Sequence, residues 1–321
     1  MPSHVYRVTK YDPADRDERG HYHGPEDVVS DHGAVEAAYL KAVAAFAADT
    51  GVDHLVVREP EVSSLVHFGA EPAGEDFGLD ALFPSGRGGF HDGARVPLDV
   101  GLGLVRVMLR DGGAWCRLEV EDTFAVHVGW DQYVYVGSDR ACEQALARTR
   151  ALGLFPERLA ASPYAFGAGD GQEERGVQRP ADDAFWADVR QAVAAGRAGI
   201  LEEMYLEGAS RWHHLTGDSV DPVRAGLAPR ARLAVWPPLS TDVEAVLSAL
   251  PADGLVEGVW QCEDGLVHSA VAHEEVFPEL AARMSGARAA ALLSVYADER
   301  VPVCTAVMPD QDGVLRARWC I

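Results

Sequence analysis

The stretch from Gly167 to Pro180, GAGDGQEERGVQRP, most constrains what this chain can fold into. It is rich in glycine and charge, it lacks apolar periodicity, and it ends at a proline. These are properties of linkers. A chain of 321 residues is also long enough for two domains of ordinary size. We therefore predict an N-terminal domain over residues 1–166, a linker over 167–180 and a C-terminal domain over 181–321.

Strand and helix patterns are mixed in the N-terminal half. Apolar stripes at helical spacing, each followed by glycine, predict helices that end at Gly51, Gly112 and Gly153. Alternating apolar residues predict short strands between them. The expected helices cover residues 34–48, 97–111 and 140–152, and the expected strands cover 5–8, 54–58, 115–120, 124–128 and 133–136.

The C-terminal half shows the same mixture. Asp264-Gly265 and Asp312-Gly313 are typical hairpin turns between strands. Helices are expected over 182–206, as one helix or two shorter ones, and over 241–250 and 274–284. Strands are expected over 232–236, 255–262, 266–270, 290–296, 302–307 and 314–319. The predicted fold class is α+β, with two domains that each have a mainly antiparallel sheet and helices packed on one face.

The charge of the chain limits its partners. Twenty-eight Lys and Arg stand against 50 Asp and Glu, which gives a formal net charge of −22. Such a field repels nucleic-acid backbones and anionic lipid surfaces, and it attracts basic proteins. We expect a basic protein partner, with RNA as a less favoured second partner, and neither DNA nor a membrane.

Cysteine usage and hydropathy bear on the compartment. The five cysteines include no C-x-x-C pair, the N-terminus has no apolar signal core, and no run of 18 apolar residues occurs. Neither a disulfide framework nor a membrane span is indicated. The expected location is the cytoplasm.

The segment 124–137, FAVHVGWDQYVYVG, is dense in aromatic residues. His127, Trp130, Tyr133 and Tyr135 lie on or beside neighbouring strands, and such side chains stack on bases or line pockets. They are therefore candidate binding residues. The alternative is that these strand residues face the core.

A second candidate binding pair is Arg211 and Trp212, which precede two histidines. An arginine beside a tryptophan can grip an anion or a stacked ring. Because the pair follows a predicted helix, the alternative is packing and capping at the helix end.

The loop from His21 to His32 is the candidate metal site. His21, His23, Asp31 and His32 could converge on a divalent metal if the loop folds back. The alternative is a solvated loop in which Ser30 or Asp31 caps the following helix. The chain has no G-x-S-x-G or phosphate-loop motif, so an enzyme is not the expected reading. No cofactor is expected other than this divalent metal.

Two segments carry a family resemblance. Residues 5–17, VYRVTKYDPADRD, and residues 124–137 resemble an uncharacterised actinobacterial protein family that often carries a generic RNA-binding label. The resemblance extends over most of the chain. It implies a cytoplasmic protein of similar architecture, and it carries no catalytic residues across.

The expected function is that of an acidic intracellular binding protein without catalytic activity. Its partner would be a basic protein, either an RNA-associated protein or a nuclease that it inhibits in the manner of an immunity protein. Two alternatives stay open. One is direct RNA binding through the aromatic strand residues, and the other is a metal-dependent hydrolase that uses the His21–His32 loop.

Overall fold

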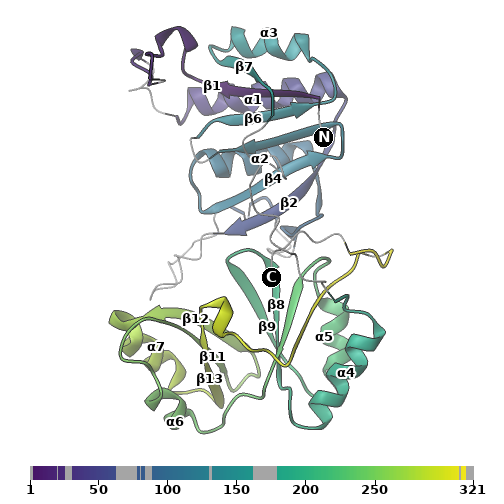
Figure 1. Cartoon of the computed structure of the whole chain (residues 1–321), viewed down its shortest axis with the longest axis vertical. Coiled ribbons are helices and arrows are strands. Elements are labelled where there is room, and N and C mark those ends of the chain that lie inside the picture. Colours follow the sequence, from purple (N-terminus) through teal and green to yellow (C-terminus); the bar gives the residue numbers. More distant parts are fainter. Residues whose placement is uncertain are drawn as a thin grey trace. The chain divides into compact units, whose positions relative to one another are not determined.

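The structure, a computed structural model, describes residues 3–19, 21–25, 31–62, 78–79, 81–83, 89–129, 132–161, 179–310 and 312–315. They divide into two compact units, with described residues up to 161 in unit 1 and those from 179 in unit 2 (Figure 1). Most of the expected linker lies outside the described residues. Both units combine helices with mainly antiparallel strands, so the α+β class is confirmed. Among the described helices, none has the length and apolarity needed to cross a bilayer.

Unit 1 is built on one seven-stranded sheet in which every neighbouring pair is antiparallel. The strand order is β3-β2-β4-β5-β6-β1-β7. The strands are β1 (His4–Thr9), β2 (His54–Val62), β3 (Arg95–Pro97), β4 (Ala114–Val120), β5 (Phe124–Val128), β6 (Val134–Ser138) and β7 (Phe155–Leu159).

Helices cover one face of this sheet. The helices of unit 1 are α1 (Ala34–Thr50), α2 (Leu98–Leu109) and α3 (Glu143–Ala151), with a 3-10 turn η1 (Pro13–Asp15). The face under α1 and α2 carries a row of buried side chains that crosses five neighbouring strands: Val57, Leu118, Val126, Val136 and Tyr6. Burial of this row fixes which face of each strand points inward.

Two glycines let α2 pack closely against neighbouring side chains. A Cβ atom on Gly101 would lie 2.5 Å from Leu55 Cδ1, and one on Gly103 would lie 2.4 Å from Leu82 Cδ2. Both distances are too short for a carbon–carbon contact. The glycine pair in this apolar helix therefore serves close packing.

Unit 2 contains two sheets. The four-stranded sheet has the order β14-β10-β8-β9, and the three-stranded sheet has the order β12-β11-β13. The strands are β8 (Ile200–Leu206), β9 (Ala209–His214), β10 (Arg232–Trp236), β11 (Leu255–Gln261), β12 (Val267–His273), β13 (Ala289–Ser294) and β14 (Cys304–Val307). Asp264-Gly265 turns the chain between β11 and β12, as its sequence predicts.

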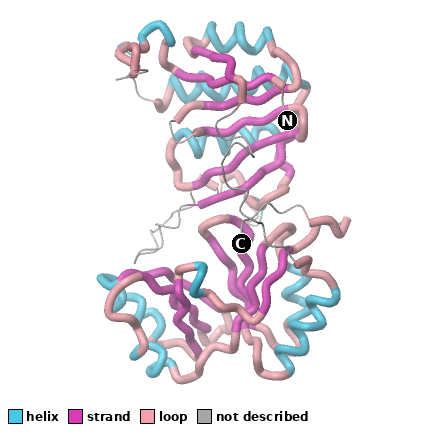
Figure 2. The backbone as a smooth tube through the Cα atoms, in the orientation of Figure 1, coloured by secondary structure: helices cyan, strands magenta, loops and turns pink. Residues whose placement is uncertain are grey.

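The two sheets of unit 2 face each other, with helices outside each (Figure 2). The helical elements are α4 (Asp183–Ala194), α5 (Val220–Gly226), α6 (Val243–Ser248), η5 (Glu274–Val276), α7 (Phe277–Met284) and η6 (Ala297–Glu299). Ile200 and Trp236 of one sheet pack with Val259 of the other. On the outer face of the three-stranded sheet, Trp260 packs with Leu280 of α7. We call the space between the sheets the inter-sheet layer.

The helix expected over residues 182–206 is present only in its first half. The helix α4 ends at Ala194, Gly196 adopts a left-handed φ of 66°, and residues 200–206 form β8. Gly199 lies so close to the next segment that a Cβ atom would be 2.5 Å from Pro238 Cα. A tight turn at these glycines therefore separates helix from strand.

Other departures are smaller. The edge strands β3 and β7 were not expected, because each is short and contains a proline. The strand expected over 314–319 lies outside the described residues from position 316, and residues 314–315 are not in a strand.

Candidate functional site

A row of polar and aromatic side chains lies on the other face of the sheet of unit 1. Strand register brings these residues into line: the five on β2, β4, β5, β6 and β1 are each one position away from a residue of the buried apolar row, and the one on β7 is directly opposite its neighbour on β1. We call them the polar row. It consists of Arg58 on β2, Arg117 on β4, His127 on β5, Tyr135 on β6, Arg7 on β1 and Glu157 on β7.

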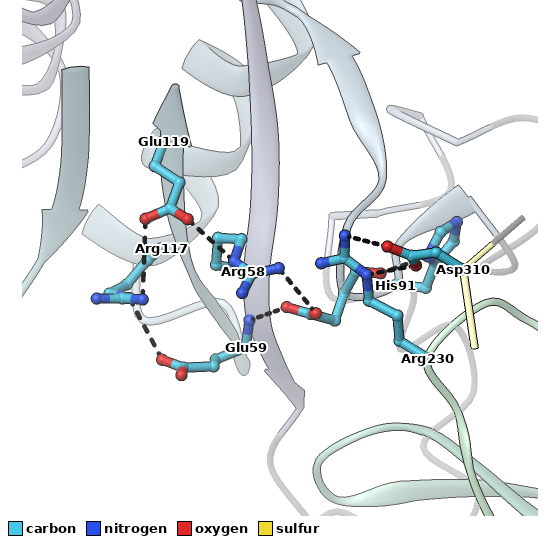
Figure 3. Close-up of polar contacts among 8 residues, drawn as sticks. Arg58, Glu59, His91, Arg117, Glu119, Arg230 and Asp310 are labelled. Atoms are coloured by element: carbon cyan, nitrogen blue, oxygen red, sulfur yellow. Dashed lines mark hydrogen bonds and ion pairs between the residues drawn. The ribbon is translucent and has the colours of Figure 1, made fainter. Parts of the chain in front are cut away.

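One end of the polar row is an ion-pair network (Figure 3). Arg58 and Arg117 are directly opposite each other on β2 and β4, and adjacent like charges repel. Carboxylates neutralise them: Arg58 contacts Asp92 and Glu119 at 3.0 Å each, and Arg117 contacts Glu59 at 3.3 Å. The residues Arg230 and Asp310, also drawn in Figure 3, form a separate ion pair of 2.7 Å within unit 2.

Asp92 fixes a backbone irregularity beside this network. The β2–β4 register shifts between Arg58 and Glu61, and Glu59 has a positive φ of 49°. The buried Asp92 accepts hydrogen bonds from Arg58 Nη1 and from the backbone N–H of Glu59. The network thus combines two guanidinium groups with three carboxylates, so it has no surplus positive charge for phosphate.

The structure brings three of the aromatic candidates near one another. His127 and Tyr135 are directly opposite, with stacked rings 5.2 Å apart, and both are almost fully buried. Burial and the charge of Arg117 lower the pKa of His127 to about 4, so His127 is neutral at pH 7. Tyr133 is half-buried and meets the ring of Tyr11 edge-on. The fourth candidate, Trp130, lies outside the described residues.

Arg211 and Trp212 lie on β9 rather than at a helix end, and they point to opposite faces of the four-stranded sheet. Arg211 and His213 both contact the fully buried carboxylate of Glu203, at 2.7 and 2.8 Å. Burial alone raises the pKa of Glu203, but the hydrogen bonds from His213 and the Ala228 N–H and the charge of Arg211 bring this pKa below its usual value.

The metal candidates do not share one set of contacts: two of the histidines lie beside Asp17, whereas Asp31 pairs with a lysine. His23 Nε2 lies 3.1 Å and His21 Nδ1 lies 3.7 Å from Asp17 Oδ2, whereas Asp31 forms an ion pair with Lys10 at 3.0 Å. His32 is exposed. Within the described ranges, no group of three or more His, Cys, Asp or Glu side chains could hold a metal ion. The divalent-metal site stays a prediction.

Two buried carboxylates meet in the inter-sheet layer of unit 2. Arg300 Nη2 lies 2.8 Å from Glu202 of β8, and Arg300 Nη1 lies 3.1 Å from Glu257 of β11. Glu202 also accepts hydrogen bonds from Trp236 Nε1 and Ser210 Oγ. Burial raises the pKa of Glu202; the charge of Arg300 opposes this effect and that of Glu257 adds to it.

Exposed carboxylates gather on the three-stranded half of unit 2. No Lys or Arg occurs between Arg232 and Arg283, and this interval contains nine Asp and Glu residues, of which only Glu257 is buried. In the described part of the chain, none of the other eight has an ion pair with Lys or Arg. We call these eight the acidic surface: Asp242, Glu244, Asp253, Glu263, Asp264, Glu274, Glu275 and Glu279.

Sequence reasoning missed several of these groups. The absence of basic residues over 233–282 was readable from the sequence. No sequence signal pairs Glu202 with Glu257, because they belong to different sheets. Likewise, Arg58 and Arg117 become neighbours only through strand register.

Comparisons of the chain with protein-family models, with curated proteins and with solved structures find no match.

Proposed function

We propose that this protein is a non-catalytic binding protein that engages a basic protein through the acidic surface of unit 2. The observation that carries the proposal is a set of eight exposed carboxylates on one part of the fold, all from residues 233–282, a stretch of sequence that contains no Lys or Arg. Such a surface accelerates encounters with a cationic partner and disfavours anionic ones.

Exposed carboxylates elsewhere in unit 2, on α4 and α5, are paired with arginines. On α4 and α5, the exposed carboxylates of Asp183, Asp188 and Asp221 each have an arginine partner at 2.6–2.8 Å. Their charges are therefore locally compensated. The acidic surface lacks such compensation, so its field is available to a partner.

The acidic surface also has a firm support. Trp260, Leu280 and Met284 form an apolar core beneath α6 and α7, and Gly258 permits the close approach of α7, because its Cβ would lie 2.7 Å from Met284 Sδ. A pre-formed charged surface suits tight recognition of a basic protein. Two kinds of partner fit, namely an RNA-associated protein and a nuclease whose cationic cleft the acidic surface would block.

The test begins with copurification from the native host, with half of the sample treated with RNase. The rate of association with a recovered basic protein is then measured at 50 and 300 mM salt. Replacing Glu244, Glu263, Glu275 and Glu279 with Gln should slow association by about tenfold at low salt and flatten the salt dependence. The control changes net charge equally at exposed acids of unit 1: Glu18→Gln, Asp99→Asn, Glu121→Gln and Glu143→Gln.

Equal slowing by both variants would show that net charge alone matters and would overturn the assignment to the acidic surface. Recovery of RNA without a protein would instead favour direct RNA binding by unit 1. In that case Tyr133→Ala should lower the affinity for RNA, because stacking on a base needs an accessible aromatic ring. It should change the free energy of unfolding only slightly, because Tyr133 is half-buried.

A further inference from the structure

The inter-sheet layer of unit 2 holds a guanidinium group in an acidic site. Glu202 and Glu257 come from different sheets and are 3% and 7% exposed, and both use an Oε2 atom to bind Arg300. The Arg300 guanidinium lies over the ring of Trp236, 5.0 Å from its centroid. Two carboxylates and an aromatic face are the groups that recognise guanidinium most selectively.

The site has two acidic groups and one cation. Two carboxylates share one arginine, and the described chain brings no second cation to either of them. A surplus buried carboxylate is costly unless another partner compensates it. The same layer also contains an unused donor: Trp212, opposite Glu202 on β9, is 8% exposed, and its Nε1 has no hydrogen-bond partner among the described residues.

Arg300 reaches this site from a connection with an unusual surface. The connection joins β13 to β14 and carries exposed Tyr296, Val301 and Val303, which are 51%, 79% and 37% exposed. They are three of the five exposed large apolar side chains in the described chain. Exposed apolar groups beside a charged anchor are typical of a segment that meets a partner.

We propose that the site formed by Glu202, Glu257 and Trp236 receives an arginine side chain of the basic partner, in exchange for Arg300. This inference rests on the proposed function and names the chemistry that the partner must present. The guanidinium of the partner takes the two carboxylates, a carbonyl group of its backbone accepts the hydrogen bond of Trp212 Nε1, and the departing connection exposes its apolar side chains to the partner. Arg300 acts as a competitor that keeps the site filled until the partner binds.

The test uses N-acetyl-L-arginine amide as the probe and tryptophan fluorescence of the full chain as the readout. Arg300→Ala should bind the probe at least about tenfold more tightly than the wild type, which is the gain expected when the removed competitor occupies the site for about nine-tenths of the time or longer. Arg230→Ala breaks the ion pair with Asp310 elsewhere in unit 2, and it should leave the affinity unchanged. N-acetyl-L-lysine amide should bind Arg300→Ala more weakly than the arginine probe, because an ammonium group does not bridge two carboxylates in a planar fork.

The exchange is refuted if Arg300→Ala and the wild type bind the arginine probe equally, if Arg230→Ala shows the same gain, or if the lysine probe binds as well. Loss of Arg300 leaves two buried carboxylates unpaired and can unfold the unit. The variant Arg300→Lys keeps a cation and serves if the alanine variant does not fold; it too should bind the arginine probe more tightly than the wild type. The probe is small and involves no partner protein, so failure here leaves the association test of the acidic surface unaffected.

Discussion

Glu202 and Glu203 are adjacent in sequence, but the strand places their carboxylates in opposite environments. Successive residues of β8 point to opposite faces, so Glu202 enters the inter-sheet layer while Glu203 meets Arg211 and His213. The pKa of Glu202 is raised by burial, whereas the pKa of Glu203 is lowered because its bonds outweigh burial. Their contributions to stability should therefore depend on pH with opposite signs.

Glu203→Gln should lower the free energy of unfolding at pH 7 by about 2 kcal/mol, because it weakens charge-assisted bonds to a fully buried group. A carboxyl whose pKa is lowered on folding stabilises above its unfolded pKa and loses that effect as the pH falls. The deficit of Glu203→Gln should thus shrink as the pH falls below the unfolded pKa of about 4.3 and through the lower pKa of the folded protein. Urea unfolding at several pH values measures it.

Glu202→Gln is the matched control for this experiment. Because the pKa of Glu202 is higher in the folded than in the unfolded protein, the ionised side chain contributes least to the stability of the wild type. The loss of unfolding free energy caused by Glu202→Gln should therefore be small at pH 7 and should grow as the pH falls. Deficits that change in the same direction for both variants would contradict the assigned environments.

His127 should make the fold sensitive to mild acid. Its pKa is about 4 in the folded protein and about 6.5 in an unfolded chain. When the pKa of a base is lower in the folded than in the unfolded protein, the fold becomes less stable as the pH falls below the pKa of the unfolded chain. The free energy of unfolding of the wild type should therefore fall by about 2–3 kcal/mol between pH 7 and pH 4.5 through this residue.

His127→Gln, which has no titrating group there, should lose correspondingly less over the same range. Urea midpoints at both pH values measure the difference. Parallel pH dependence in the two proteins would show that His127 is protonated without cost and is not held neutral by burial.

At the scale of elements, apolar periodicity located most helices and strands because each packs one face on a core. It predicted α1, α2 and α7, and the hairpin of β11 and β12, close to their observed bounds. It failed over 195–206. Here β8 is buried on both faces, so Ile200-Leu201-Glu202-Glu203 shows no alternation of apolar and polar residues, and the buried glutamates resemble the polar side of a helix.

The turn before β8 supplies a test at this scale. Gly199→Ala should lower the free energy of unfolding by about 1–3 kcal/mol, because the new Cβ meets the backbone of Pro238, which cannot rotate away. Gly226→Ala is the matched control in the same unit: it ends α5, has open space around the added methyl group, and should raise stability by about 0.4–1 kcal/mol. Thermal unfolding measures both, and equal effects would contradict the close approach.

At the scale of the whole molecule, the sequence revealed the sign of the charge but not its distribution in space. Charge counts of the two halves are alike, which suggests an even surface. The fold places the eight carboxylates of the segment without basic residues on or beside α6, α7, β11 and β12, while the arginines of the polar row of unit 1 point to the face opposite its helices. Strand register and inter-sheet packing determine both arrangements, and neither has a local sequence signal.

The acidic surface should make unit 2 less stable at low ionic strength. Eight uncompensated carboxylates repel one another, and salt screens that repulsion with a Debye length of about 10 Å at 0.1 M. Replacing Glu244, Glu263, Glu275 and Glu279 with Gln should therefore raise the melting temperature at 20 mM salt by a few degrees, about 1 kcal/mol, and reduce the further gain on going to 500 mM. The four-site variant of unit 1 should keep the salt response of the wild type. A bound basic partner would relieve the same repulsion. The carboxylates of the acidic surface that lower the stability of the free protein should therefore raise the affinity of its complex. A salt response unchanged by the four glutamine substitutions would break this link between the stability of the acidic surface and its proposed use in binding.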